Sequence, residues 1–416
     1  MTEPARPPAW IAMSSDHAAA VLATLVFVAL GLGREVVGSV EFVWVAVSAQ
    51  IGPGRAAGDP SLLPHLLWLL HWVMGDVMWA GRALGVLSGV AVVVFSTRLF
   101  GPWAGLWAMA QLPLLTGVLL ADPALPAVAL LMATLSFGQR GRTGLAGICG
   151  GLAVGCGSWM LPVAVFAVWL GRRRWRALGV LGVVLGLLFL LGVRVIPEWS
   201  ASSNSSTRFA SSGLDWTLVL GAAALLWGAL RRSRPALMLL SVVLVSAMGA
   251  IVTLEAPDSL LHLFLLLALG VAAVETGPAL LLLALITLGV RLPDVYRPST
   301  EEAGRATVIS AMSGRQGKAL CTTRTFVRAS DDGWLRPCVG LDTLSRAPAS
   351  WRPEDVRESA RVLGARWLAV EDASVRDRYF NLQPLLRDDA PTGFSTIVSA
   401  PGWRVFSLES DPRREP

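Results

Sequence analysis

The sequence predicts a mainly α-helical, polytopic membrane protein that ends in a small α/β domain. Three observations support this fold class. Of the 416 residues, 54% are hydrophobic and only 15% are charged, whereas soluble domains carry about 25% charged residues. The apolar residues form runs long enough to cross a bilayer core of about 30 Å. After Arg291, the composition changes to charged and polar.

The positive charge follows the apolar runs. The net charge of +6 is carried by arginine, because Lys318 is the only lysine. Basic clusters lie beside apolar runs at 138–142, 171–176 and 231–234. Arginine-rich loops of this kind mark the cytoplasmic side of a membrane protein. We therefore interpret them as topology signals and expect no nucleic-acid partner.

The first stretches of the chain predict a tail, a span and an outer loop. Residues 1–16 form a polar segment, which we expect to be a cytoplasmic tail. Residues 17–32 are apolar, and no small-x-small cleavage site follows them, so a first transmembrane helix is favoured over a cleaved signal peptide. Residues 33–81 form the longest hydrophilic interruption of the first half. Within it, 62–78 is rich in leucine and tryptophan, which favours a helix lying in the membrane interface.

The later spans alternate with short loops. About 28 residues separate the basic loops 138–142 and 171–176, and loops on one side need an even number of crossings between them. Glycines at this place permit a tight hairpin of two short helices. With the hairpin counted twice, about eleven crossings are expected, with the N-terminus inside. The other spans after the outer loop are expected at 83–98, 103–120, 124–137, 177–193, 216–230, 235–254, 259–274 and 278–290.

These spans make residues 17–291 one transmembrane domain, and 292–416 are long enough for a second domain with its own core. LGARWLAVED predicts a helix end followed by a buried strand, and GWRVFSLES predicts another short strand. A helix is expected over 352–364, with Pro353 at its start. Because eleven crossings begin inside, this α/β domain is expected to be extracytoplasmic.

The four cysteines fall into two pairs. Cys149 and Cys156 lie on one face of an apolar run and are expected to be small packing residues. Cys321 and Cys338 lie in the polar tail, where an oxidising compartment would let them form a disulfide. Two unrelated buried thiols are the alternative. No metal-ligand spacing such as CxxC occurs in the sequence.

The acidic residues beside the spans fall on the predicted outer side. A carboxylate at a membrane boundary must be hydrated, paired or in use, because burying an isolated charge in hydrocarbon is costly. Asp122, between two apolar spans, also suits the N-cap of a helix with proline at the next position. These outer acids are Glu35, Glu41, Asp59, Asp122, Glu255 and Asp258.

Four motifs in order carry a resemblance to a known family. They are R-x-x-x-x-x-S-G from Arg82, then LFGPWAGLWA, ADPALPAVALL and a glycine-rich GLAGICGGLAVG followed by LP. Together they resemble the membrane core of bacterial C-type glycosyltransferases, the relatives of protein O-mannosyltransferases and lipid A aminoarabinose transferases. The resemblance covers roughly residues 17–200. It implies transfer of a sugar from a polyprenyl-phosphate donor to a lipid, glycan or protein acceptor, at the outer face of the bacterial inner membrane.

The resemblance also implies catalytic roles. In this family the first outer loop carries the catalytic acid, usually in an Asp-Glu pair near an aromatic residue. Here Glu41 stands alone, followed by Phe42 and Trp44. A carboxylate in apolar surroundings tends to have a raised pKa, as a general base needs. Glu41 is therefore the first candidate for the base, and Glu35 is the second.

Other positions are candidates for binding the substrates. Asp122 matches the family's Asp-Pro carboxylate, which would orient the acceptor or hold a divalent cation such as Mg²⁺ or Mn²⁺. Arg82 matches an arginine at the start of the second span, and it or Arg34 would supply positive charge at the donor phosphate. His65 is a further substrate-binding candidate. Its spacing from His71 favours interfacial anchoring over metal binding.

Two other functions compete with sugar transfer. The Asp-Glu pair is missing, and Cys156-Gly-Ser-Trp159 replaces the family's Thr-Lys-Gly. Both departures favour a degenerate protein of the same fold that only binds or scaffolds. A lipid or sugar transporter is less favoured, because transporters place ionisable groups at mid-membrane and these spans carry almost none.

Overall fold

The structure is a computed structural model of the chain. The structure describes 9–32, 61–75, 77–119, 121–122, 124–196, 216–253, 261–275 and 277–296 in the helical part. In the C-terminal part it describes 317–322, 327–329, 335–337, 339–341, 347–387, 391–408 and a few isolated residues between 303 and 344.

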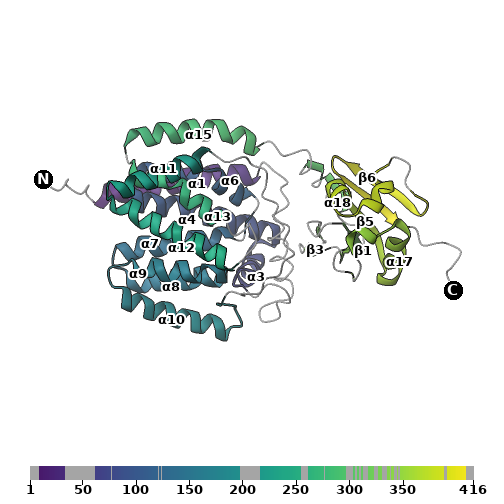
Figure 1. The fold of residues 1–416 in the computed structure, drawn as a ribbon, viewed down its shortest axis with the longest axis horizontal. Coiled ribbons are helices and arrows are strands. Elements are labelled where there is room, and N and C mark those ends of the chain that lie inside the picture. Colours follow the sequence, from purple (N-terminus) through teal and green to yellow (C-terminus); the bar gives the residue numbers. More distant parts are fainter. Residues whose placement is uncertain are drawn as a thin grey trace.

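The described residues between 9 and 296 form a bundle of helices that lies beside a separate α/β domain (Figure 1). The helices follow the predicted spans in order, so the predicted fold class is confirmed. Their bounds are α1 Ala9–Leu32, α3 Leu63–Met74, α4 Val77–Phe100, α5 Pro102–Met109, α6 Leu112–Leu119, α7 Ala124–Gln139, α8 Thr143–Cys156, α9 Leu161–Trp169, α10 Arg174–Leu190, α11 Trp216–Leu230, α12 Arg234–Thr253, α13 Leu261–Ala268, α14 Gly270–Val274 and α15 Pro278–Tyr296.

Two of the predicted spans are broken helices. The span predicted over 103–120 consists of α5 and α6, which both contact α4 and so together run along it. The span predicted over 259–274 consists of α13 and α14, which both contact α11 and α12. The interfacial helix ends at Met74, because Gly75 takes the left-handed conformation (φ 73°). Met78 therefore belongs to α4, which begins six residues before the predicted span.

Length and composition alone single out few helices. Among the described residues, only Trp79–Phe100 is both long and apolar enough by itself to cross a membrane. The other apolar helices have 10–17 residues each. The multispan character therefore depends on the arrangement of the helices as well as on their individual lengths.

The predicted hairpin between the basic loops is α8 and α9, joined by a short 3-10 turn at Ser158–Met160. Glycines of α8 let its backbone approach α10. A Cβ atom on Gly147 would lie 2.6 Å from the Ala177 carbonyl oxygen, and one on Gly151 would lie 2.5 Å from a Val184 methyl group. Small residues at this spacing allow close helix packing in membranes.

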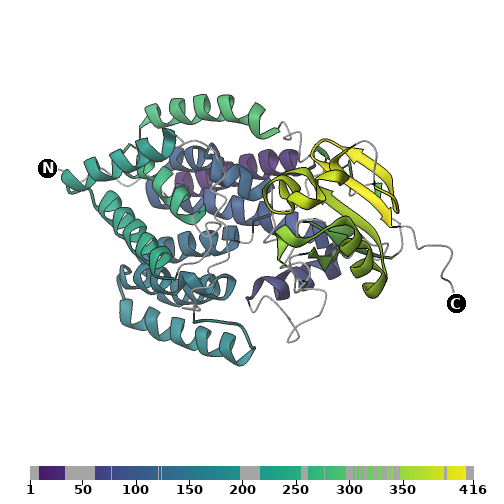
Figure 2. The same ribbon diagram turned by 45° about the vertical axis from the view of Figure 1, so that its right-hand side comes forward.

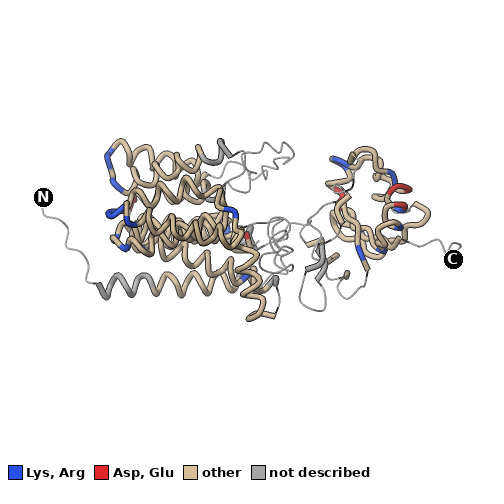
Figure 3. Tube along the Cα trace, turned by 90° about the horizontal axis from the view of Figure 1, so that it is seen from below, with Lys and Arg blue, Asp and Glu red and all other residues tan. Residues whose placement is uncertain are grey.

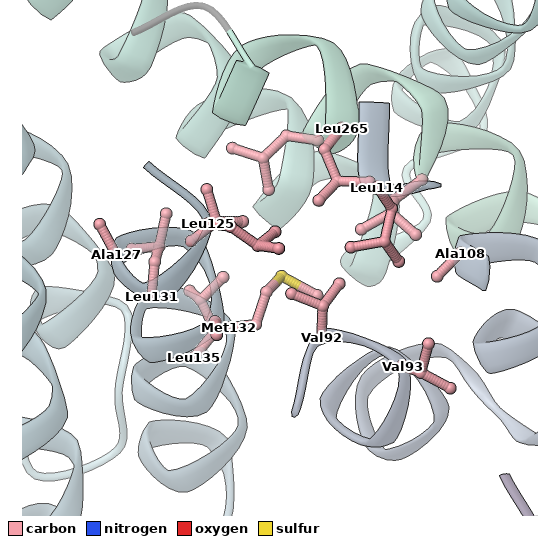
Figure 4. Packing of buried hydrophobic residues seen from close by; sticks show 14 of the residues in the cluster. Val92, Val93, Ala108, Leu114, Leu125, Ala127, Leu131, Met132, Leu135 and Leu265 are labelled. Atoms are coloured by element: carbon pink, nitrogen blue, oxygen red, sulfur yellow. The ribbon is translucent and has the colours of Figure 1, made fainter. Parts of the chain in front are cut away.

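The core of the bundle lies where α4, α6, α7 and α13 meet. Val92 of α4, Leu114 of α6, Met132 of α7 and Leu265 of α13 are buried in one cluster, and their side chains converge in Figure 4. Lipid tails are as apolar as these side chains, so the cluster stabilises the bundle chiefly through close van der Waals packing. In both Figure 1 and Figure 2, α10 and α15 lie at opposite sides of the bundle.

The C-terminal domain is built on a five-stranded sheet in the order β4-β1-β5-β7-β6. Strand β1 is parallel to β4 and β5, and β7 is antiparallel to β5 and β6. The predicted strands are β5 and β7, and the predicted helix is α17, whereas the other three strands of this sheet, β1, β4 and β6, were not predicted. The bounds are β1 Lys318–Cys321, β2 Val327–Ala329, β3 Leu335–Pro337, β4 Val339–Gly340, α17 Pro353–Leu363, β5 Ala365–Glu371, α18 Asp372–Asp377, β6 Phe394–Ala400 and β7 Trp403–Leu408.

The cysteines differ between the two parts of the chain. Cys149 and Cys156 are free thiols in α8. Cys321, at the end of β1, is disulfide-bonded. Cys338, the fourth cysteine of the sequence, lies outside the described residues. The predicted pairing of Cys321 with Cys338 stays a prediction.

Figure 3 shows that the arginines of the bundle gather mainly at the end away from the α/β domain. This is the end where the loops after α7, α9 and α11 lie. One acidic residue beside the spans, Glu275, was not considered in the sequence analysis. Glu275 follows α14 at this basic end, because Val274 packs beside Gly228 and Ala236 around the α11–α12 loop. The flanking acids are therefore not confined to the opposite end.

Candidate functional site

The turn that carries Asp122 is fixed by backbone hydrogen bonds. The Asp122 N–H donates to the Gly117 carbonyl oxygen at 2.9 Å, which closes the C-terminal cap of α6. The Asp122 Oδ1 atom accepts a hydrogen bond from the Ala124 N–H at 2.8 Å. Asp122 is thus the N-cap of α7, as its position before proline predicts. One carboxylate oxygen serves this cap.

The residue before Asp122 has an unusual backbone. Ala121 takes the left-handed conformation with φ 51°, which glycine normally provides at this position of a helix cap. Its neighbour on α4 is Gly85, where a Cβ atom would lie 3.1 Å from the Val118 carbonyl oxygen and 3.5 Å from the Ala121 Cα. The glycine therefore lets the turn lie directly against the backbone of α4.

Arg82 lies on the same face of α4 as Gly85, one helical turn earlier. The packing of Gly85 against Ala121 therefore brings the turn of Arg82 beside the Asp122 turn. The Arg82 guanidinium also lies 5.0 Å from the centre of the Trp79 ring. The structure thus places the two family-matched positions, Arg82 and Asp122, at the same end of neighbouring elements.

His65 is carried by α3, which packs against α4 at this end. The Leu62 N–H donates to the Gly155 carbonyl oxygen at 2.7 Å, so α3 begins beside the 156–159 break between α8 and α9. The His65 Nδ1 atom is buried and has no hydrogen-bond partner within the described part of the chain. The outward face of α3 is apolar, since Trp72 and Val73 are 72% and 77% exposed, which suits the predicted interfacial helix.

Three predicted site residues cannot be placed. Glu41, Glu35 and Arg34 lie outside the described residues, and the roles predicted for them stay predictions. Within the described ranges, no group of three or more His, Cys, Asp or Glu side chains could hold a metal ion.

Arg291 of α15 is a buried charge that the sequence reading missed. Its side chain is 7% exposed and lies inside the bundle. One guanidinium nitrogen is 3.4 Å from the Ala110 carbonyl oxygen, and the other donates to the Thr217 Oγ1 atom at 3.1 Å. The signal was present in the sequence, because Arg291 follows an uninterrupted apolar run from Pro278. A charge in such a run is a functional or structural marker.

The breaks in α5–α6 and α13–α14 expose backbone groups that polar side chains satisfy. The Trp107 Nε1–H donates to the Ala268 carbonyl oxygen at 2.7 Å, just before the α13–α14 break. The Gln111 amide donates to the Trp107 carbonyl oxygen at 2.7 Å. The Arg291 guanidinium likewise donates to the Ala110 carbonyl oxygen, between α5 and α6. Such contacts explain how irregular backbone can persist inside the bundle.

Comparison with known proteins identifies the fold. No protein-family model matches the sequence, and no curated protein matches it. The crystal structure of ArnT from Cupriavidus metallidurans, bound to undecaprenyl phosphate, matches with a TM-score of 0.54 at 16% identity. The match covers 98% of this chain and 99% of that chain. The chain has the fold of this ArnT structure. The sequence resemblance over residues 17–200 is thereby confirmed at the level of fold, and the shared fold extends through the C-terminal α/β domain.

Proposed function

We propose that the chain is an integral-membrane glycosyltransferase that moves a sugar from a polyprenyl-phosphate donor to an acceptor at the outer face of the bacterial inner membrane. The observation that carries this proposal is the shared fold over 98% of the chain with a protein solved with undecaprenyl phosphate. The disulfide at Cys321 supports an oxidising compartment for the C-terminal domain.

In the proposed reaction, the acceptor oxygen attacks the sugar carbon that carries the phosphate. The bond from that carbon to the phosphate oxygen breaks, and polyprenyl phosphate leaves with the electron pair. Glu41, or in second place Glu35, takes the proton of the acceptor hydroxyl. Arg82 and Arg34 stabilise negative charge on the departing phosphate.

Asp122 would orient the acceptor, because its carboxylate is held on the turn that packs against α4. His65 would bind substrate from α3 beside the same end. The described residues do not make a ligand set for Mg²⁺ or Mn²⁺. Asp122 is one carboxylate, and its Oδ1 atom already caps α7. No step of the proposed reaction passes through a cation.

A second candidate is a protein of the same fold that binds the lipid and does not transfer sugar. The sequence favours it at two places. Glu41 has no acidic neighbour, and no lysine is present at 156–159. The two candidates differ in one measurable property, which is turnover.

The experiment is sugar transfer by purified full-length protein from a panel of polyprenyl-phosphate sugars, with Glu41→Gln and Asp122→Asn as variants. A hundredfold or greater loss of rate is expected for Glu41→Gln, the order of magnitude of a general base. Asparagine caps a helix as well as aspartate does, so Asp122→Asn tests the charge and preserves the turn.

Glu275→Gln is the matched control, because Glu275 is an exposed acid at the opposite end of the bundle. Its transfer rate should equal that of the wild type. Full activity of both Glu41→Gln and Asp122→Asn would overturn the site assignment. A wild-type protein that binds the donor lipids and transfers none of their sugars would establish the second candidate.

A further inference from the structure

Two arginine-rich loops at the end of the bundle away from the α/β domain form one joined surface. They are the α7–α8 loop (residues 138–142) and the α9–α10 loop (residues 171–173). The Arg172 N–H donates to the Gly138 carbonyl oxygen at 3.3 Å. A Cβ atom on Gly171 would lie 3.2 Å from the Gly138 Cα, so glycine at both positions allows the two backbones to touch.

This joined surface, which we call the basic platform, carries a dense positive charge. Its arginines are all exposed, and neither 138–142 nor 171–176 contains an acidic residue. Holding like charges together costs free energy through mutual repulsion unless an anion lies among them. The arginines of the basic platform are Arg140, Arg142, Arg172, Arg173, Arg174 and Arg176.

Indole rings set the depth of the basic platform. The Arg174 guanidinium lies 4.1 Å from the centre of the Trp169 ring, and the Trp169 and Trp175 rings meet edge to face at 5.3 Å. Trp175 is 71% exposed. Tryptophan prefers the headgroup level of a bilayer, so these rings place the neighbouring guanidinium groups at the level of lipid phosphates.

The apolar surface continues from the basic platform along α8. Leu145 and Ile148, in the first two turns after the α7–α8 loop, are exposed large apolar side chains. A ligand bound at the arginines would therefore have apolar side chains beside it. This combination fits an amphipathic molecule better than a free inorganic anion.

We propose that the basic platform binds the headgroup of an anionic phospholipid that carries two phosphates, from the leaflet on that side of the membrane. Each guanidinium can present two N–H groups to one phosphate, a geometry that lysine lacks. The two joined loops supply arginines for two phosphates, and Trp175, Leu145 and Ile148 contact the acyl chains. The proposal is independent of sugar transfer.

The third basic loop, between α11 and α12, provides an internal control. It lies at the same end, since the Gln139 Nε2 atom contacts the Met238 Sδ atom at 2.6 Å. Arg231 stacks on Trp227 with 4.4 Å to the ring centre, which resembles the arrangement on the platform. The difference is Glu275, whose neighbour Val274 packs against this loop's helices. An acid close by makes the third loop a poorer phosphate site.

The test is native mass spectrometry of the full-length protein titrated with cardiolipin, the diphosphate probe lipid, or with phosphatidylcholine. The platform variant is Arg140→Gln/Arg172→Gln, and the control variant is Arg231→Gln/Arg234→Gln. Two surface arginines should change affinity by roughly tenfold or more. We expect that loss in the platform variant, a change within about twofold in the control, and no saturable binding of phosphatidylcholine.

Several results would overturn the proposal. One is an equal loss of cardiolipin affinity in both double variants, because binding would then depend on the total positive charge and not on the basic platform. Another is displacement of the lipid by pyrophosphate at an equal concentration, because the acyl chains would then contribute nothing. If the Gln variant fails to fold, Arg140→Lys/Arg172→Lys is measured in its place, because it keeps the charge and removes the guanidinium groups. Weakened binding by this Lys variant supports the arginine site, and unchanged binding rejects it.

Discussion

The two ends of the helical bundle hold charge in different ways. At the basic end, the arginines of the loops after α7 and α9 are exposed, and the backbone beneath them is joined through Gly138 and Gly171. At the opposite end, Asp122 is held by its own N–H and by its Oδ1 atom, on a turn packed against Gly85.

The difference shows which charges can be assigned from sequence. Exposed arginines in short loops are solvated however the helices pack. Their clustering along the chain is therefore enough to predict at which end of the bundle they lie. A carboxylate at a candidate site needs a fixed position, and long-range packing supplies it. Four predictions test or sharpen this contrast.

The largest expected effect concerns sidedness. Single cysteines at Arg172→Cys and Ser205→Cys should be labelled from opposite sides of the membrane by an impermeant thiol reagent, because arginine-rich loops are expected on the cytoplasmic side and the 205 loop on the outer side. The Arg172 backbone bond to Gly138 does not depend on its side chain. Labelling of both positions from the same side would contradict the predicted order of membrane crossings.

The second prediction concerns the disulfide at Cys321. If Cys321 and Cys338 close a loop, Cys321→Ser should lower the stability of the C-terminal domain by about 3 kcal/mol. Thermal unfolding with and without reductant measures the effect, and Cys156→Ser serves as the control because Cys156 is a free thiol. Non-reducing mass spectrometry that finds free thiols at both 321 and 338 would contradict the pairing.

The third prediction tests the contact that places Asp122. In Gly85→Ala, the new methyl group would meet the Val118 carbonyl oxygen at 3.1 Å, so the turn must move from α4. We expect a loss of about 1–2 kcal/mol in the free energy of unfolding, together with slower sugar transfer. Gly289→Ala is the control, since nothing lies within 4 Å of its added Cβ and alanine favours a helix. Equal stability and equal transfer rates in both variants would mean that the Gly85 contact does not position the Asp122 turn.

The smallest expected effect compares left-handed residues at the two ends. Arg232, with φ 57°, ends α11 in the same cap geometry that Ala121 uses after α6. Arg232→Gly should stabilise the protein by about 1 kcal/mol, because glycine adopts this backbone without strain. Ala121→Gly should gain less, because it also removes a buried methyl group. Equal gains in chemical or thermal unfolding would show that the Ala121 methyl contributes no packing.

Much of the candidate site could be found from sequence, though not its arrangement. The N-cap role of Asp122 follows from a polar residue before proline, whereas Arg82 became a candidate only through the family resemblance. Arg291 was readable as a lone charge in an apolar run, yet its partners at Ala110 and Thr217 are far away in the chain. No local pattern predicts such partners.

The sequence by itself determined the helical spans, the basic end, strands β5 and β7 and the cap of α7. Each depends on the local order of apolar, charged and cap-forming residues. Only the tertiary structure decided that Gly85 meets Ala121, that Gly138 meets Gly171, and that α5–α6 and α13–α14 are broken where Trp107 and Arg291 satisfy the backbone. Such contacts join residues distant in the chain, and their geometry depends on how whole helices pack rather than on any one segment.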